Sequence, residues 1–206
     1  MKPLWLVLPL LIATVPLFAD KNTAPKFAPG SASSYASKQT NDGVTIAVRT
    51  YDTEELAHSA FGDVNPYQYG ILPVLVIVQN DTNETLRLDR LQASYEGLDD
   101  KRIDATPAAD VPYAVESPKR PNAPVASPIP IKKKHKNPLG GGEVETRAFA
   151  ARMLPPHETA YGFFYFQTHH RPGDSVYLTG IKFASSGKDV FYFEIPVKDE
   201  SSLTPH

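Results

Sequence analysis

The first regular feature along the chain is an alternation of apolar and polar side chains that starts at residue 43. Val44, Ile46 and Val48 fall on one face of a strand, because successive side chains of a strand point to opposite sides. The run 72–78 is apolar throughout, which is typical of a central strand that is covered on both faces. The pattern therefore predicts two strands, of which the second lies inside a sheet.

Further strands are predicted on both sides of a long proline-rich stretch. The alternation across 86–95 changes parity near Asp89, which indicates one strand with a β-bulge, and a short partner follows at 102–105. We interpret 147–154 as a strand rather than a short helix, because large apolar residues alternate there with small or charged ones. The remaining predicted strands are an aromatic one at 160–167 and a hairpin of 176–183 with 190–197.

One short helix is predicted to end near residue 61, since Asp52 and Glu55 fit the pattern of an N-terminal cap. The tetrapeptide 171–174 predicts a type II turn, because its proline fixes φ and its glycine supplies a positive φ. Seven or eight short strands with so little helix indicate the all-β class and a β-sandwich. The aromatics expected in its core are Phe163, Phe166, Phe191 and Phe193.

The N-terminal segment has the layout of a secretory signal peptide. A lysine at position 2 precedes the charge-free apolar stretch 3–19, and the chain turns polar at Asp20. We predict cleavage after Ala19 and an exported chain, in the periplasm or outside the cell. The alternative is a membrane anchor through residues 3–19 that stays uncleaved, although this stretch is shorter than the ~20 residues that a spanning helix needs.

Three more segments complete the predicted organisation. Residues 20–42 hold few apolar side chains, so they cannot offset their ordering entropy and are predicted to form a flexible linker. The β-sandwich domain is predicted over 43–198, and 199–206 is predicted to be a tail.

The overall composition is that of a soluble globular protein. The 206 residues are 41% hydrophobic and 21% charged, which excludes wholesale disorder and a polytopic membrane protein. There is no cysteine, so disulfides, thiolate metal sites and cysteine nucleophiles are excluded as well. An exported fold of this kind must be held together by its core alone.

The stretch 117–142 interrupts the domain and is basic. It is rich in proline, ends in three glycines and carries no acidic residue, whereas the whole chain has 21 Lys and Arg against 23 Asp and Glu. We predict a long disordered insertion. The alternative is that its cations contact an anionic partner, such as a phosphorylated wall polymer, lipid head groups or an acidic protein. The candidate binding residues are Lys119, Arg120, Lys132, Lys133, Lys134 and Lys136.

Nucleic acid is excluded as the anionic partner. The rest of the chain is acidic, and no aromatic side chains for base stacking are interleaved with the lysines.

Several motifs in order resemble the telokin-like, immunoglobulin-fold domains of exported bacterial proteins. Residues 71–82 match a core strand that ends in a polar Asn turn, and 154–159 followed by 162–166 match a Leu-Pro turn leading into a glycine and an aromatic strand. His157 stands where those domains have a turn glycine, and the basic stretch is not part of their pattern. The resemblance covers about residues 44–197. It implies an immunoglobulin-like sandwich that serves as a binding or structural module.

No motif of a known catalytic, phosphate-binding or dinucleotide-binding site occurs in the chain. The neighbouring carboxylates at 54–55 and 99–100 are expected to be solvated or capping groups, because an acid/base pair must face across a cleft. We therefore predict that the chain is not an enzyme and uses no cofactor.

No metal site is predicted, but one alternative stays open. Copper accepts Met and His ligands, and Met153, His157, His169 and His170 lie near predicted strand ends. If the strands pair, His157 and His169 lie at opposite strand ends, which hinders shared ligation.

The sequence thus predicts a non-catalytic, exported binding or structural module of the bacterial cell envelope that contacts a protein or an anionic envelope polymer. The alternative is a periplasmic metal-handling protein of the copper type, or an enzyme whose site the sequence does not reveal.

Overall fold

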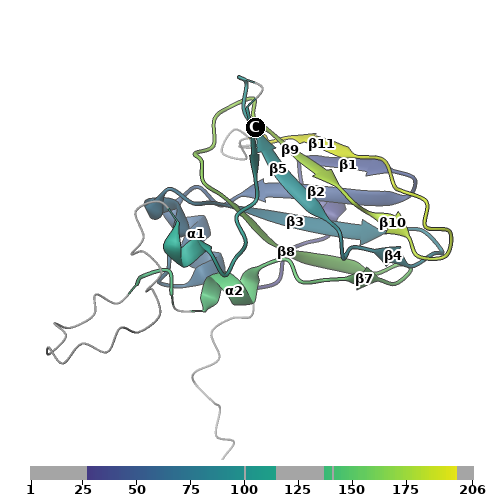
Figure 1. Cartoon of the computed structure of the whole chain (residues 1–206), viewed down its shortest axis with the longest axis horizontal. Coiled ribbons are helices and arrows are strands. Elements are labelled where there is room, and N and C mark those ends of the chain that lie inside the picture. The colour runs from purple at the N-terminus through teal and green to yellow at the C-terminus, as the bar shows by residue number, and fades with distance from the viewer. Residues whose placement is uncertain (1–26, 100, 115–136, 141, 199–206) are drawn as a thin grey trace, which may run out of the picture.

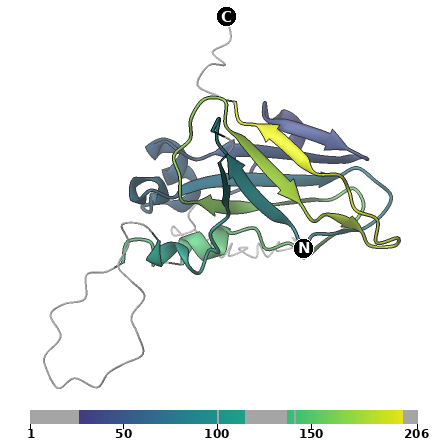
Figure 2. The ribbon, with the colours of Figure 1, turned by 45° about the horizontal axis from the view of Figure 1, so that its top comes forward.

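Two antiparallel sheets pack face to face, and a third, small sheet lies at one end of them (Figure 1). The computed structural model describes residues 27–99, 101–114, 137–140 and 142–198. The first sheet has the order β1 (Lys38–Asn41), β2 (Val44–Thr50), β3 (Leu72–Asn80), β8 (Thr159–Phe166). The second has the order β11 (Phe193–Pro196), β9 (Ser175–Thr179), β5 (Gln92–Glu96), β6 (Arg102–Asp104), and its strands lie in front of the first sheet in Figure 2. The small sheet has the order β10 (Lys182–Phe183), β4 (Leu86–Arg87), β7 (Met153–Leu154).

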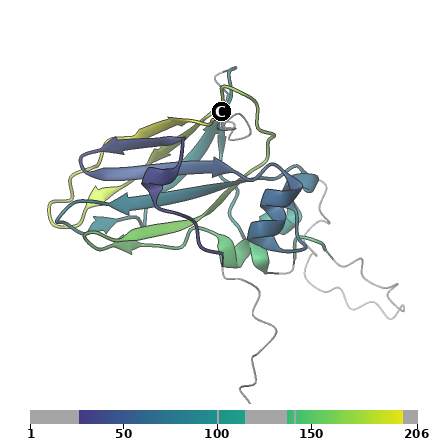
Figure 3. The same cartoon turned by 180° about the vertical axis from the view of Figure 1, so that it is seen from behind.

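Short helices cover part of the outer face of the first sheet (Figure 3). They are α1 (Glu54–Phe61), α2 (Glu143–Arg147) and three 3-10 turns at Ala32–Ser34, Pro66–Tyr69 and Val111–Tyr113. Among the described residues, no helix combines the length and the apolar character that crossing a membrane requires.

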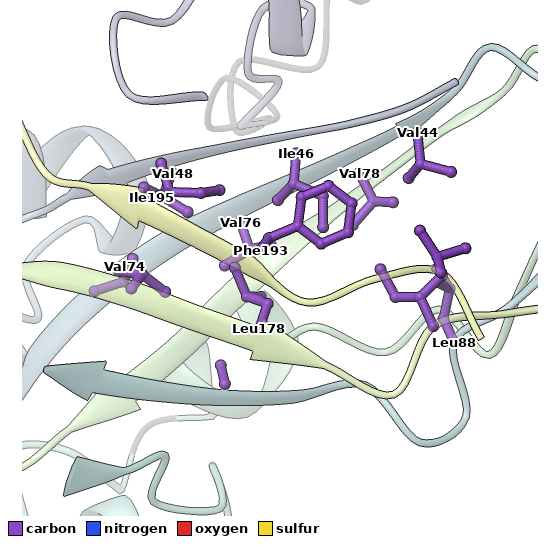
Figure 4. Close-up of a cluster of buried hydrophobic side chains, with 14 of the residues drawn as sticks. Val44, Ile46, Val48, Val74, Val76, Val78, Leu88, Leu178, Phe193 and Ile195 are labelled. Atoms are coloured by element: carbon purple, nitrogen blue, oxygen red, sulfur yellow. The ribbon is translucent and has the colours of Figure 1, made fainter. Parts of the chain in front are cut away.

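The central strand β3 is buried on both faces, as its apolar sequence predicts. Val74, Val76 and Val78 point into the core between the two large sheets, where they meet side chains of β2, β9 and β11 (Figure 4). Leu75 and Ile77 point the other way, into a second core under the helices. The strand β8 alternates in the same manner, so the predicted all-β sandwich is confirmed.

Eleven strands in the described part of the chain replace the predicted seven or eight. The predicted strands 86–95 and 176–183 are each divided between two sheets, and β1 lies in the predicted linker. The bulge expected near Asp89 is wrong: the Leu91 N–H donates to the Leu88 carbonyl (3.0 Å), and this turn carries the chain from the small sheet to the second sheet.

The strand predicted at 147–154 is wrong for most of its length. Arg147 is the last residue of α2, and the Phe149 N–H then donates to the Phe163 carbonyl (3.1 Å) at a single bridge beside β8. The chain leaves this edge and joins β4 only at Met153, where β7 begins.

The domain begins before residue 43, so the predicted linker is too long. The Phe27 ring lies 5.5 Å from the Phe163 ring, Tyr35 is nearly buried, and β1 pairs with β2. Residues 20–26 of the linker, the predicted signal peptide and the predicted tail 199–206 lie outside the described residues.

The C-terminal end of the predicted disordered insertion belongs to the folded domain. Leu139 is buried under α2, and the Asn137 side chain donates to the Pro112 carbonyl (2.7 Å). The insertion up to residue 136 lies outside the described residues.

The helix α1 ends at Phe61 as predicted, but its cap is one residue later than expected. The Thr53 hydroxyl, not Asp52, accepts a hydrogen bond from the Leu56 N–H (3.2 Å). Of the four predicted core aromatics, Phe191 is 67% exposed and lies before β11 begins, so its assignment to the core is wrong.

Asn80 ties the end of β3 to the turn before β8. Its side chain is fully buried and donates to the carbonyls of Glu84 (2.8 Å), Leu154 (3.2 Å) and Pro155 (2.9 Å). Its Oδ1 accepts from the backbone and hydroxyl of Thr82 (3.1 and 2.7 Å). One side chain thereby satisfies groups from two segments, the β3–β4 connection and the residues at the end of β7.

The edge of β11 is covered by side chains of the chain segment around β1. The Gln39 side chain accepts from the Glu194 N–H (2.8 Å), and the Ser37 hydroxyl accepts from the Lys198 N–H (2.8 Å). The Asn41 amide donates to the Tyr192 carbonyl (3.0 Å). Ser37, Gln39 and Asn41 alternate along the chain, so their side chains reach the same edge.

Candidate functional site

A groove of about 540 Å³ opens on the side of the sandwich where β8 ends the first sheet and β5 and β6 end the second. The crossover 105–108 leaves β6 there and reaches β8 at a bridge from Thr106 to Tyr165. Residues 148–149 contact β8 at Phe163. The side chains used in the argument below come from five segments: Ser94, Arg102, Asp104, Phe149, Phe164 and Tyr177.

The wall from the second sheet is polar. The Arg102 guanidinium lies 4.1 Å from the centre of the Tyr177 ring and forms an ion pair with Glu96 (2.9 Å). That hydrogen bond, with the charge of Glu96, raises the pKa of Arg102, so the guanidinium stays charged. The Ser94 hydroxyl donates to Asp104 (2.9 Å) across the β5–β6 pair.

The opposite wall is aromatic. Phe149 and Phe164 stack with their rings 5.6 Å apart and an interplanar angle of 22°. Gly162 permits this approach, because a Cβ at that position would lie 2.3 Å from the Phe149 Cα. A side chain at residue 162 would therefore push the wall away from β8.

The charged groups of the groove are already partnered within the protein. Glu96 neutralises the charge of Arg102, and Asp104 accepts a hydrogen bond from Ser94 while it keeps its negative charge. The groove thus offers aromatic faces and hydroxyl, amide and backbone groups. Such a lining suits a neutral ligand of mixed polarity.

A buried polar cluster lies at the other end of β5. The Tyr95 hydroxyl is 2.5 Å from His170 Nδ1, which lies 4.0 Å from the Asp174 carboxylate. Burial, and then the negative charge of Asp174, raise the pKa of Tyr95, so the phenol stays protonated. Asp174 also accepts from the Arg171 N–H (2.8 Å), across the turn predicted at 171–174.

The cluster of Tyr95, His170 and Asp174 also stabilises the turn at 171–174. Gly173 has φ = 95°, and the Asp174 N–H donates to the Arg171 carbonyl (3.1 Å), as a type II turn requires. The side chains of His170 and Asp174 are only 4% and 3% exposed. With so little access to solvent, the cluster positions the 168–174 connection against β5.

The histidines of the copper alternative are not brought together. His157 lies in the turn before β8 and His169 follows its end, so the eight residues of β8 separate them by roughly 25 Å. Among the described residues, no group of three or more His, Asp or Glu side chains could hold a metal ion.

His157 has a local role in its turn. Its φ is 60°, in the left-handed region that favours glycine, the residue found there in the family that the sequence resembles. Its Nε2 lies 3.2 Å from the Asn83 side-chain oxygen.

The basic residues singled out from the sequence lie outside the described residues. They are Lys119, Arg120, Lys132, Lys133, Lys134 and Lys136. The groove itself was not predicted. One signal of the groove is present in the sequence: apolar and polar residues alternate in β5 and β9, which places Ser94 and Tyr177 on the outward face.

Comparison with known proteins gives no family. No family model matches the chain, and no curated protein matches it. Among solved structures, a secreted protein of Mycobacterium tuberculosis, MPT63, is similar with 10% identity and a TM-score of 0.35, over 80% of this chain and 95% of that one. A functionally unknown protein of Listeria monocytogenes has 12% identity and a TM-score of 0.34, over 78% and 81% of the two chains.

A Bacillus subtilis structure, described as a candidate lipoprotein (ycdA), has 14% identity and a TM-score of 0.38. The similarity covers 80% of this chain but only 39% of that one, so the present chain spans about two fifths of its length. At these identities and TM-scores, the similarities carry no conclusion about family or activity.

Proposed function

We propose that the chain is a non-catalytic, exported binding module of the cell envelope, and that its groove holds an extended segment of a partner protein. The observation that carries this proposal is the groove itself. It runs beside the edges of two sheets and joins a stacked aromatic wall to a wall of internally paired polar groups.

An extended peptide suits this lining better than a charged ligand does. The edge strand β6 offers backbone groups to a peptide main chain, whereas β8 is already bridged by Thr106 and Ala148. The aromatic and aliphatic surfaces accept alternate side chains of the peptide. Arg102 is paired with Glu96 inside the protein, and the carboxylate of Asp104 repels anions, so the groove offers no net attraction to an anionic ligand.

A bulky residue in the groove should weaken peptide binding. Thr179 lies in the groove, and Thr179→Trp would fill part of it without altering the core side of β9. Peptides selected on the wild-type protein from a random display library should bind the variant at least about tenfold more weakly, a loss of ~1.4 kcal/mol. Fluorescence anisotropy measures both affinities.

The control is Thr159→Trp. Thr159 is exposed at the first residue of β8, at the end of that strand away from the residues that line the groove. The selected peptides should bind this variant as they bind the wild type. Equal weakening by both tryptophans, or a selection that enriches no peptide, would contradict the proposal.

Export is the second part of the proposal, and it is supported by the apolar stretch 3–19 after a basic start. Protein recovered from the cell envelope should begin near Asp20 when its N-terminus is sequenced. An intact Met1 on membrane-bound material would support the anchor instead.

The basic insertion is proposed, on its sequence alone, to contact an anionic envelope partner. Changing Lys132, Lys133, Lys134 and Lys136 to serine should weaken co-sedimentation with purified cell wall, and salt should weaken it for the wild type as it screens charges beyond ~10 Å at 0.1 M. The unfolding midpoint should stay almost unchanged. Equal and salt-insensitive retention of both proteins would count against the contact.

A further inference from the structure

The end of the sandwich formed by the small sheet carries a hollow of about 220 Å³ whose lining is mainly cationic. It lies at the end where Figure 1 labels β10, β4 and β7, away from α1 and α2. The residues that line it are Arg87, Asp89, Arg90, Gly180, Lys182 and Gly187. Three cations therefore surround one carboxylate, in a chain whose acidic residues outnumber its basic ones.

The register of the small sheet places two cations opposite each other, which destabilises the pairing of its strands. Arg87 and Lys182 are direct partners across the antiparallel pair of β4 and β10. Like charges placed directly opposite each other destabilise a sheet, whereas opposite charges would support it. A local conflict of this kind is expected where the residues serve a function.

The carboxylates nearby compensate the cations only in part. Asp89 pairs with Arg87 (3.1 Å), and Asp189, which is largely exposed, pairs with Lys182 (3.1 Å). Arg90 forms no ion pair or hydrogen bond of its side chain with any residue that the structure describes. The hydrogen bond from Arg87, with the charges of Arg87 and Arg90, lowers the pKa of Asp89, as expected in a positive field.

The backbone fixes Arg90 beside the hollow. A Cβ at Gly180 would lie 1.9 Å from the Arg90 carbonyl oxygen, so only glycine allows the β9–β10 turn to pack on this residue. Gly180 also has φ = 88°, which favours glycine for a second reason. The backbone from which the Arg90 side chain extends is thus held at a defined place beside the hollow.

We propose that this hollow binds a phosphoryl group. Arginine forks match the oxygens of phosphate, and a lysine ammonium adds a point charge, a combination that recurs in phosphate recognition. The hollow opens to solvent, so a phosphoryl group can enter it while the rest of the phosphorylated molecule stays outside. This site lies apart from the groove, involves another ligand chemistry, and does not depend on the groove's function.

The test uses the full exported chain in the background of the four serine substitutions at 132–136, so that those lysines do not contribute. The site variant is Arg90→Gln with Lys182→Gln. The control is Lys101→Gln with Lys198→Gln, which removes the same charge outside the hollow. Inorganic phosphate and phosphatidylglycerol vesicles are the two probes, at low salt.

Inorganic phosphate should shift the backbone amide resonances of 87–90 and 180–188 in the control protein, and the site variant should lose these shifts. Vesicles should retain the control at least tenfold better than the site variant if the phosphoryl group is that of a lipid. Binding of phosphate without vesicles would identify a soluble source. Equal behaviour of the two variants, or shifts outside these residues only, would overturn the proposal.

Discussion

Phe166→Ala is expected to lower the free energy of unfolding by about 3–5 kcal/mol. Phe166 has no exposed surface and lies between the two large sheets, with its ring 5.5 Å from that of Tyr95. Its removal leaves a cavity that neighbouring strands cannot fill without breaking their pairing. Because the chain has no disulfide, this loss falls on a domain whose total stability is typically about 5–15 kcal/mol.

Chemical denaturation monitored by circular dichroism measures the effect, and Phe191→Ala is the matched control. The control removes the same ring from a position that is 67% exposed, so its effect should stay within about 0.5 kcal/mol. Equal unfolding midpoints for the two variants would show that the core between the sheets is placed wrongly.

Asn80→Ala should have an effect of similar size for a different reason. The change removes a side chain that satisfies three carbonyls and two donors at the end of β3. Each buried group left without a partner costs about 1–3 kcal/mol, so the total loss should be roughly 3–5 kcal/mol.

The control for Asn80 is Asn83→Ala. Asn83 lies in the same turn but is exposed, and its side-chain oxygen lies 3.2 Å from His157 Nε2. Thermal unfolding of both variants should show a large fall in the melting temperature for Asn80→Ala and a small one for Asn83→Ala. Comparable shifts would mean that water replaces the Asn80 hydrogen bonds.

The sequence was most informative where a pattern is both local and long. The apolar run of β3 needs no knowledge of its partners, because burial on both faces shows in every residue. The resemblance to exported immunoglobulin-fold domains rests in part on the polar Asn80 after that run and on the Leu-Pro turn at 154–155, and the structure joins these two by hydrogen bonds.

The predicted strands are wrong in their limits where the chain passes from one sheet to another. The parity change near Asp89 is typical of a bulge within one strand, yet Leu86–Arg87 and Gln92–Glu96 belong to different sheets, and alternation does not say which sheet a strand joins. Phe191 has the same parity as the buried Phe193, but the strand begins only at Phe193, so parity does not extend to it.

Neither of the two proposed sites could be predicted from the sequence, and the physical reason is the same for both. The groove combines five segments, and the cationic hollow combines β4 and its following turn with the β9–β10 turn and β10. The lining residues of the groove and of the hollow form no sequence motif, because each set is spread over distant parts of the chain. Only the long-range pairing of strands brings Arg87 opposite Lys182 or Phe149 onto Phe164.

The side chains along the edge of β11 bear on how the chain escapes aggregation. An uncovered strand at the margin of a sheet is a template on which a second molecule can add its own strand. Here Ser37, Gln39 and Asn41 occupy the backbone groups that such an addition would use. The residues of this cover precede β11 in the chain, so they are already synthesised when this margin of the second sheet forms. Molecules that lost residues 37–41 would expose that margin and join one another edge to edge.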